Sequence, residues 1–108
     1  MTRKLIVRPR AEIDRASHFL YLSERSPQAA LRFEKAVSNA FSRIQEDSQP
    51  GARLLLPDAK TLDLRFYRPK GFKKYLIIFR LDGETIYIAR ILHGSQDIET
   101  AVLDDDTF

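Results

Sequence analysis

Cysteine is absent from this chain of 108 residues, so no disulfide and no thiolate metal site can stabilise the fold. The absence fits a reducing compartment, where disulfides are rare. Hydrophobic residues make up 44% of the chain, which lies in the range of globular domains. A domain of this length buries roughly two-thirds of the surface of its unfolded chain. We therefore expect a fold held by an ordinary hydrophobic core, with no bound metal and no cofactor.

Long apolar runs are also absent, and none approaches the roughly 18 residues of a membrane span. The N-terminus, MTRKLIVRPR, is basic, but its apolar part extends only from Leu5 to Val7 and is too short for a secretory signal. No internal repeat, low-complexity tract or linker divides the chain. The sequence therefore predicts one domain over residues 1–108, located in the cytoplasm and without a membrane partner.

Charge is distributed unevenly along the chain, although the net charge is only +3. Between Lys60 and Arg90 there are eight lysines and arginines and three acidic residues, which leaves a local charge of +5. From Asp97 to the C-terminus there are five acidic residues and no basic ones. A basic centre favours an anionic partner, either nucleic acid or an acidic protein segment. A solvated strand surface with scattered cations would give the same pattern.

Two amphipathic helices are predicted in the N-terminal half, after a short strand over residues 4–8. Pro9 fits the first turn of a helix because its missing N–H costs nothing there. The first helix is expected over 9–24, and Ser26 and Pro27 then provide the N-cap and first position of the second. Pro50-Gly51 ends the second helix. So short a break predicts an antiparallel helical hairpin.

The spacing of apolar residues predicts which side of each helix is buried. In the first helix this side consists of Ile13, Ala16, Phe19, Leu20 and Ser23. In the second helix it consists of Ala30, Phe33, Val37, Ala40, Phe41 and Ile44.

After Gly51 the pattern changes to that of strands. Residues 52–61 are predicted as a loop with a turn at Pro57-Asp58, and 62–68 as a strand of alternating apolar residues that places Phe66 in the core. Residues 75–81 are nearly continuously apolar, as expected of a central strand covered on both sides, with Phe79 in the core. Asp82-Gly83 marks a hairpin turn into an antiparallel strand over 86–92.

The order of elements is therefore strand, helix, helix and three strands, with a short turn or helix over 96–103. Grouped helices followed by grouped strands predict an α+β fold. We expect the antiparallel helical hairpin to pack on one side of a small, mainly antiparallel sheet (β-α-α-β-β-β with a short C-terminal helix).

Three short motifs in this order resemble the RelE/ParE superfamily of bacterial toxins. They are Leu64-Arg65, the run Gly71-Phe72…Tyr75…Phe79-Arg80, and the strand end Arg90-Ile91-Leu92-His93-Gly94. The resemblance extends from Pro9 to about Ala101 and is closer to the ParE-like branch. It departs from that branch at Gln96-Asp97, where ParE-like chains commonly carry an arginine before the aspartate. A role that needs a cation at position 96 is therefore not expected.

The resemblance implies a toxin of a type II toxin–antitoxin system, associated with plasmid stabilisation. Such a toxin is neutralised in a hetero-oligomer by a cognate antitoxin, here ParD-like or related. ParE-like members are associated with poisoning of DNA gyrase, whereas RelE-like members cut mRNA on the ribosome. Direct nucleic-acid binding stays open. A third alternative is an inactive member of the family that keeps only its antitoxin binding.

A metal-free ribonuclease site requires a proton acceptor, a proton donor and fixed cations around one phosphate. Arg65, Arg80 and Arg90 lie on neighbouring predicted strands, and the imidazole of His93 can exchange protons near neutral pH. However, the segment after the last strand, SQDIETAVLDDDTF, has no arginine, lysine, histidine or tyrosine, whereas RelE-like nucleases typically carry an arginine and a tyrosine there. A regular strand would also direct Arg90 and His93 to opposite sides. We therefore predict no catalytic residue and a toxin that acts by binding.

The residues predicted to contact the target are Arg65, Lys70, Phe72, Lys73, Lys74, Arg80, Arg90 and His93. Arg65 can instead pair with Asp63 or Glu84 across the sheet. His93 can simply close the last strand by a hydrogen bond to the backbone while Gly94 turns the chain. His18, inside the first helix, is expected to be structural or to face solvent. The antitoxin is expected to lie along the helical hairpin and to add a strand to the exposed sheet edge.

Overall fold

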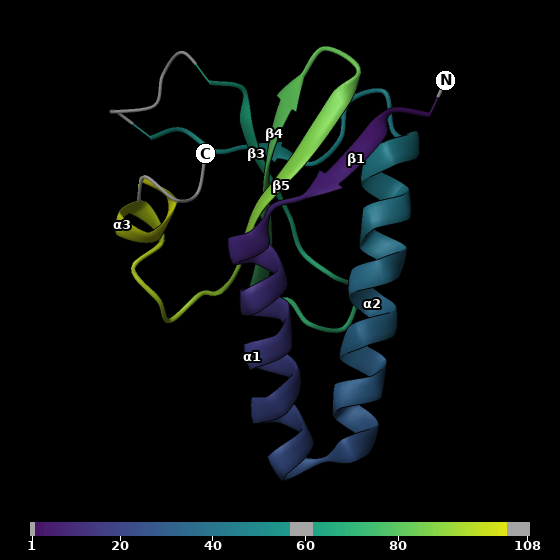
Figure 1. Cartoon of the computed structure of the whole chain (residues 1–108), viewed down its shortest axis with the longest axis vertical. Helices are drawn as coiled ribbons and strands as arrows, with labels where there is room; N and C mark the ends of the chain where they lie inside the picture. Colours follow the sequence, from purple (N-terminus) through teal and green to yellow (C-terminus); the bar gives the residue numbers. More distant parts are fainter. Residues whose placement is uncertain (1, 57–61, 104–108) are drawn as a thin grey trace.

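The fold consists of a long helical hairpin beside a five-stranded sheet, in a computed structural model that describes residues 2–56 and 62–103. Helices α1 (Pro9–Arg25) and α2 (Pro27–Glu46) run side by side and extend beyond the sheet (Figure 1). The strands are β1 (Lys4–Val7), β2 (Ala52–Arg53), β3 (Leu64–Tyr67), β4 (Tyr75–Asp82) and β5 (Thr85–His93), followed by the short helix α3 (Ile98–Val102). The predicted α+β fold is confirmed.

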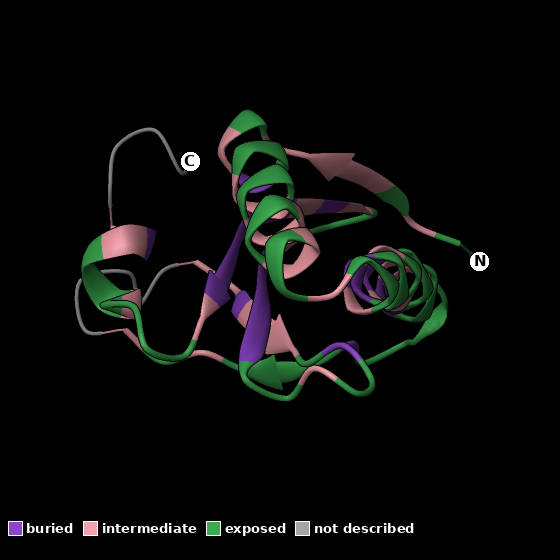
Figure 2. Cartoon of the chain, turned by 90° about the horizontal axis from the view of Figure 1, so that it is seen from below, coloured by how far each residue is buried: buried purple, intermediate pink, exposed green. Residues whose placement is uncertain are grey.

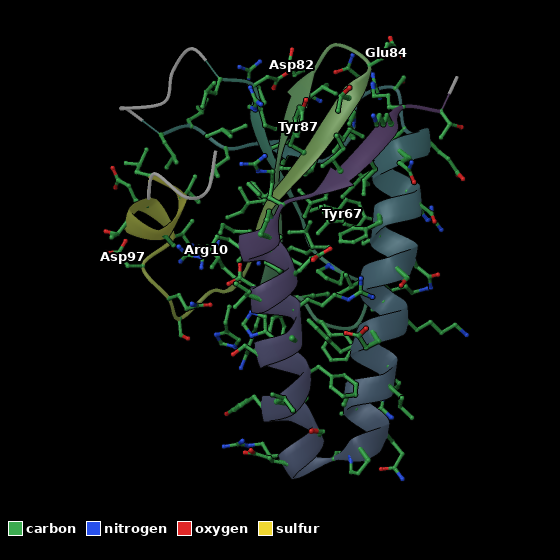
Figure 3. The ribbon with its side chains drawn as sticks, in the orientation of Figure 1. Arg10, Tyr67, Asp82, Glu84, Tyr87 and Asp97 are labelled. Carbon is green, nitrogen blue, oxygen red and sulfur yellow. The ribbon has the colours of Figure 1, made fainter. Side chains whose placement is uncertain are left out.

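The sheet has the strand order β1-β5-β4-β3-β2. The N-terminal strand β1 pairs in parallel with β5, and the other neighbours are antiparallel. Strands β4 and β5 form a hairpin whose turn begins at Gly83, with a left-handed φ of 59° that glycine adopts without strain. Figure 3 shows Asp82 and Glu84 at this tip. The register shifts between Ile78 and Phe79, which makes Ala89 the extra residue of a bulge in β5.

Both sides of β4 are buried, as its continuous apolar run predicted. Figure 2 shows the buried residues concentrated in the central strands. On the hairpin side, Phe33 and Val37 of α2 pack with Ile77 and Phe79 of β4. On the other side of the sheet, a second apolar cluster packs around Val102 of α3 and consists of Leu64, Leu76, Ile78 and Leu92. Helix α2 begins at Pro27 as predicted but ends at Glu46, before Pro50-Gly51. Its buried side matches the prediction, except that Phe41 is only partly buried. Phe66 is partly buried as well, in the second cluster.

The buried side of α1 differs from the prediction, which was wrong for this helix. Ile13 and Leu20 are 62% and 61% exposed, whereas Ala11 is fully buried. Asp14 and His18, which are polar and were left out of the apolar pattern, are turned toward the sheet and half-buried. The reason is a backbone requirement of β5 rather than hydrophobic burial.

Helix α1 takes the place of a missing strand along the edge of β5. The ladder with β1 ends where the N–H of Arg8 donates to the Ile88 carbonyl at 2.9 Å. Beyond that point the Ile91 N–H donates to a carboxylate oxygen of Asp14 at 2.9 Å, and the Ile91 carbonyl lies 2.8 Å from Nε2 of His18. A carbonyl only accepts, so His18 carries a proton on Nε2. His18 therefore has a structural role, which is one of the two roles that the sequence suggested for it.

The Asp14 carboxylate also closes a buried ion pair. Arg90 donates to both of its oxygens, at 2.7 and 2.9 Å, and a further nitrogen of the guanidinium donates to the Ala101 carbonyl at 3.1 Å. The side chains of Arg90 and Asp14 are only 7% and 11% exposed. Since buried charges persist only when they are paired, this contact fixes α1, β5 and α3 relative to one another.

The connections show one further difference from the sequence-based expectation. Ala52 and Arg53 pair with β3 as the short strand β2, although residues 52–61 were predicted as a loop. Two exposed residues carry no alternation from which a strand could be recognised. The predicted turn at Pro57-Asp58 lies outside the described residues, as does Lys60.

Ser26 caps α2 as expected by accepting from the Ala29 N–H at 3.2 Å. No helix in the described ranges has the length and apolar character needed to cross a bilayer.

Replacement of Asp14 by alanine should destabilise the protein strongly. It leaves the Arg90 charge and the Ile91 N–H buried without their partner, and breaking a buried pair costs about 3–5 kcal/mol. The free energy of unfolding in urea measures the effect. Glu12→Ala, an exposed change in the same helix, is the control and should cost about 0.5 kcal/mol or less. Equal stability of the two variants would show that the buried pair does not hold α1 in place.

Candidate functional site

A cleft of about 790 Å³ opens between α1 and the ends of β4 and β5. One wall is formed by α1, a second by the loop between β3 and β4, and a third by the turn that follows β5. The residues that line it are Ser17, His18, Tyr21, Leu22, Arg25, Gly71, Phe72, Lys73, Lys74, Tyr75, His93, Ser95 and Gln96. Its position on three elements makes it the principal candidate for a binding site.

The lining of the cleft is positively charged. Arg25, Lys73 and Lys74 contribute three cations, and the part of the lining that the structure describes contains no carboxylate. The guanidinium of Arg25 lies 3.8 Å from the ring centre of Tyr21, one helical turn away, and this contact orients both side chains. Low-dielectric walls of one charge sign concentrate the field, so the cleft attracts an anionic group.

The two lysines are presented by a tight loop. Gly71 has a left-handed φ of 84°, and the N–H of Phe72 donates to the Pro69 carbonyl at 3.0 Å. Arg68 donates to the Lys73 carbonyl from the start of the same loop. These backbone contacts fix the loop, so Lys73 and Lys74 extend from a defined support.

The floor of the cleft is aromatic. The ring of Tyr75 lies between the imidazoles of His18 and His93, with both ring centres at 5.0 Å and both contacts nearly perpendicular. Burial raises the pKa of the Tyr75 phenol, and the nearby phenol of Tyr21 raises it further. The Tyr75 hydroxyl therefore stays protonated throughout the neutral pH range.

His93 closes β5 and is held by the turn that follows. Its Nδ1 accepts from the Ser95 N–H at 3.1 Å, and its own N–H donates to the Gln96 side-chain oxygen at 2.7 Å. Because Nδ1 is the acceptor, the neutral ring carries its proton on Nε2. The strand-closing role expected of His93 is thus confirmed. Gly94 does not have a left-handed φ; a side chain there would instead place Cβ 3.3 Å from the Lys74 carbonyl.

Four of the eight predicted target-binding residues come together in this cleft. They are Phe72, Lys73, Lys74 and His93. Lys70 lies on the α2 side of Phe72, in a different groove. The three arginines do not join the cleft.

Each of the arginines is engaged elsewhere. Arg65 donates to both oxygens of Asp63, at 3.0 and 3.2 Å, which is one of the pairings that the sequence suggested. Arg80 lies on the other side of the sheet, 4.7 Å from the Tyr87 ring centre and 3.7 Å from an Asp82 oxygen. Arg90 is paired with Asp14.

The bulge does not bring Arg90 and His93 together. It is located at Ala89, before Arg90, and regular alternation resumes after it. Arg90 therefore lies on the α3 side of the sheet, whereas His93 lies on the other side against Tyr75. The geometry separates the imidazole from the strand arginines that a nuclease would need beside it.

Sequence reasoning missed the wall that α1 contributes. Ser17, Tyr21 and Arg25 follow one another at intervals of four residues, so they lie along one side of the helix. An exposed tyrosine with a cation one turn later was the available signal for a binding surface. It was not recognised because the helix was interpreted only through its apolar residues.

Comparisons with known proteins agree with the fold and extend it. A family model described as the ParE toxin of the type II toxin–antitoxin system parDE matches residues 5–98. "Toxin RelE1" of Caulobacter vibrioides is 31% identical over 94 residues, which cover 87% of this chain and 96% of that protein. A solved structure described as the chromosomal ParDE TA system from P. aeruginosa has a TM-score of 0.66 at 20% identity, over 85% of this chain and 96% of that chain. This likeness supports the fold alone.

The family model covers most of the chain, including the strands and the helix that build the cleft. The curated relative spans nearly the same length. The chain therefore belongs to the ParE toxin family of type II toxin–antitoxin systems.

Proposed function

We propose that this protein is a toxin that inhibits DNA gyrase by binding it through the cleft, and that a cognate antitoxin neutralises it. The observation that carries the proposal is the lining of the cleft, which has three cations, several aromatic side chains and, among residues 2–56 and 62–103, no carboxylate. Such a lining can hold an anionic or aromatic group of a partner. The gyrase target itself comes from family membership.

The same cleft offers little for phosphodiester cleavage. RNA cleavage without metal needs one group to accept a proton and another to donate one. The Nε2 proton of His18 is used in the bond to Ile91, and the raised pKa of the Tyr75 phenol makes its hydroxyl a poor proton acceptor. The strand arginines are paired elsewhere, so they do not stand beside His93 to hold a phosphate. These features favour binding over bond breaking.

A ribosome-dependent mRNA endonuclease is the second candidate. It is favoured by the position of His93 beside Lys73 and Lys74 in one cleft and by the relative named "Toxin RelE1". A lysine could assist proton transfer there. A toxin that has lost its activity and keeps only antitoxin binding would be a third outcome of the tests below.

Two surfaces support antitoxin binding at the positions that the sequence suggested. On the hairpin, Ile13 and Leu20 of α1 and Leu31 of α2 are more than half exposed. At the sheet edge, the N–H groups of Lys4 and Arg8 bond to β5, so those of Leu5 and Val7 point away from it. An antitoxin segment could add a strand to this edge and lay an apolar helix over the hairpin.

Expression of the protein without an antitoxin should stop bacterial growth, with a DNA damage response and intact mRNA. Purified protein should inhibit gyrase supercoiling. Lys74→Glu should weaken this inhibition at least about tenfold, because a reversed charge replaces attraction to an anionic group by repulsion. Arg53→Glu, which changes the charge equally at an exposed site outside the cleft, should inhibit like the wild type.

Two results would reject this function. Cleavage of mRNA in the ribosomal A site, abolished by His93→Ala, would establish the endonuclease. Normal growth and an unaffected gyrase would establish an inactive module.

Binding of the antitoxin should depend on the exposed apolar residues of the hairpin, which are Ile13, Leu20 and Leu31. Leu20→Asp should weaken the toxin–antitoxin complex by at least tenfold in a titration, because it places a charge in an apolar contact. Leu55→Asp changes another exposed leucine on a different element and serves as the control. Hydrogen exchange should also slow at Leu5 and Val7 when the antitoxin binds. Unchanged exchange over residues 9–49 and β1 would refute this docking mode.

A further inference from the structure

A second cavity lies on the opposite side of Phe72 from the cleft. This groove, of about 710 Å³, runs between α2 and the loop that joins β3 to β4. Gly71 and Phe72 are the residues that line both cavities. Tyr67, which Figure 3 labels, belongs to the groove and not to the cleft. The groove is therefore a separate surface with its own chemistry.

Cations outnumber carboxylates in the described lining of the groove. Arg32, Lys35 and Arg43 project from exposed positions of α2, and Lys70 from the loop, against one carboxylate, that of Glu46, among the described residues of the lining. Within residues 2–56 and 62–103, none of these four cations has a carboxylate at ion-pair distance. Arg32 and Arg43 are about 16 Å apart along the helix, from its rise per residue. That length matches about five residues of extended peptide.

Small and aromatic side chains line the groove between its outer cations. Ala36 and Ala40 of α2 are small enough to let a peptide backbone approach the helix. Opposite them stand Tyr67 and Phe72, both only partly exposed. Phe72 is held edge-on against the buried ring of Phe33, with ring centres 5.4 Å apart. An apolar side chain of a peptide fits against these partly exposed rings.

We propose that this groove binds an extended acidic peptide segment of a partner protein. Its carboxylates would pair with Arg32, Lys35, Arg43 and Lys70, and an apolar side chain between them would contact Tyr67 and Phe72. In one respect the inference rests on the proposed function, because the antitoxin is then the partner expected to carry such a segment. The segment touches Phe72, so it reaches the shared wall of the cleft as well.

A single-tryptophan variant tests the groove directly, because the chain contains no tryptophan. Tyr67→Trp places the one indole in the groove and not in the cleft. The probe is an eight-residue synthetic peptide with four carboxylates and two leucines, and the competitor is a single-stranded oligonucleotide of equal charge. The peptide should produce a saturable change in tryptophan fluorescence and should bind at least tenfold more tightly than the oligonucleotide. Calorimetric titration of the unmodified protein should give the same affinity.

Charge reversal then locates the binding site. Arg43→Glu should weaken peptide binding at least tenfold, whereas Lys74→Glu in the cleft and Arg53→Glu on β2 should change it less than threefold. Absence of saturable peptide binding, tighter binding of the oligonucleotide, or equal losses in all three variants would each overturn the proposal. Growth arrest on expression distinguishes failure of the groove proposal from failure of the proposed toxin function. A toxic protein that does not bind the peptide refutes the groove alone, and a harmless protein that binds it refutes the proposed function alone.

Discussion

The contact between α1 and the free edge of β5 is the constraint on which the rest of the structure depends. Strand β1 stops at Val7, so the following, buried stretch of β5 would have unpaired backbone groups on its edge. Asp14 and His18, one turn apart on α1, satisfy the N–H and the carbonyl of Ile91. Arg90 neutralises the carboxylate that this arrangement buries. The hairpin is thereby fixed at one distance from the sheet, and the cleft is the space that this placement leaves open.

Both cavities are organised by the loop between β3 and β4. Gly71 turns the chain so that Lys70 faces α2 while Lys73 and Lys74 face α1. Phe72 stands between them and packs on the core through Phe33. The basic stretch of the sequence is thus divided between two surfaces, one proposed to bind the target and one proposed to bind an acidic segment. A partner in the groove would touch the wall of the cleft, which gives neutralisation a direct physical route.

The sequence predicted the fold well where local rules determine it. Proline and serine at the helix starts, the apolar period of α2 and the turn at Gly83 gave the elements and their order. It failed on the buried side of α1, because Asp14 and His18 are buried for a hydrogen-bonding reason that no hydrophobic pattern contains. It also grouped Arg65, Arg80 and Arg90 because they lie on neighbouring strands, although each of them is engaged by a different partner. The spacing of charged residues along the sequence does not show which of them pair in the folded protein.

The central claim is that the carboxylate of Asp14 replaces a neighbouring strand for β5, and amide hydrogen exchange at Ile91 measures this most directly. If the account holds, the Ile91 N–H exchanges as slowly as that of Ile88, which is bonded within the ladder to β1. If it exchanges as quickly as the amide of the exposed residue Lys73, α1 does not hold the edge of β5, and the cleft built on that contact loses its basis.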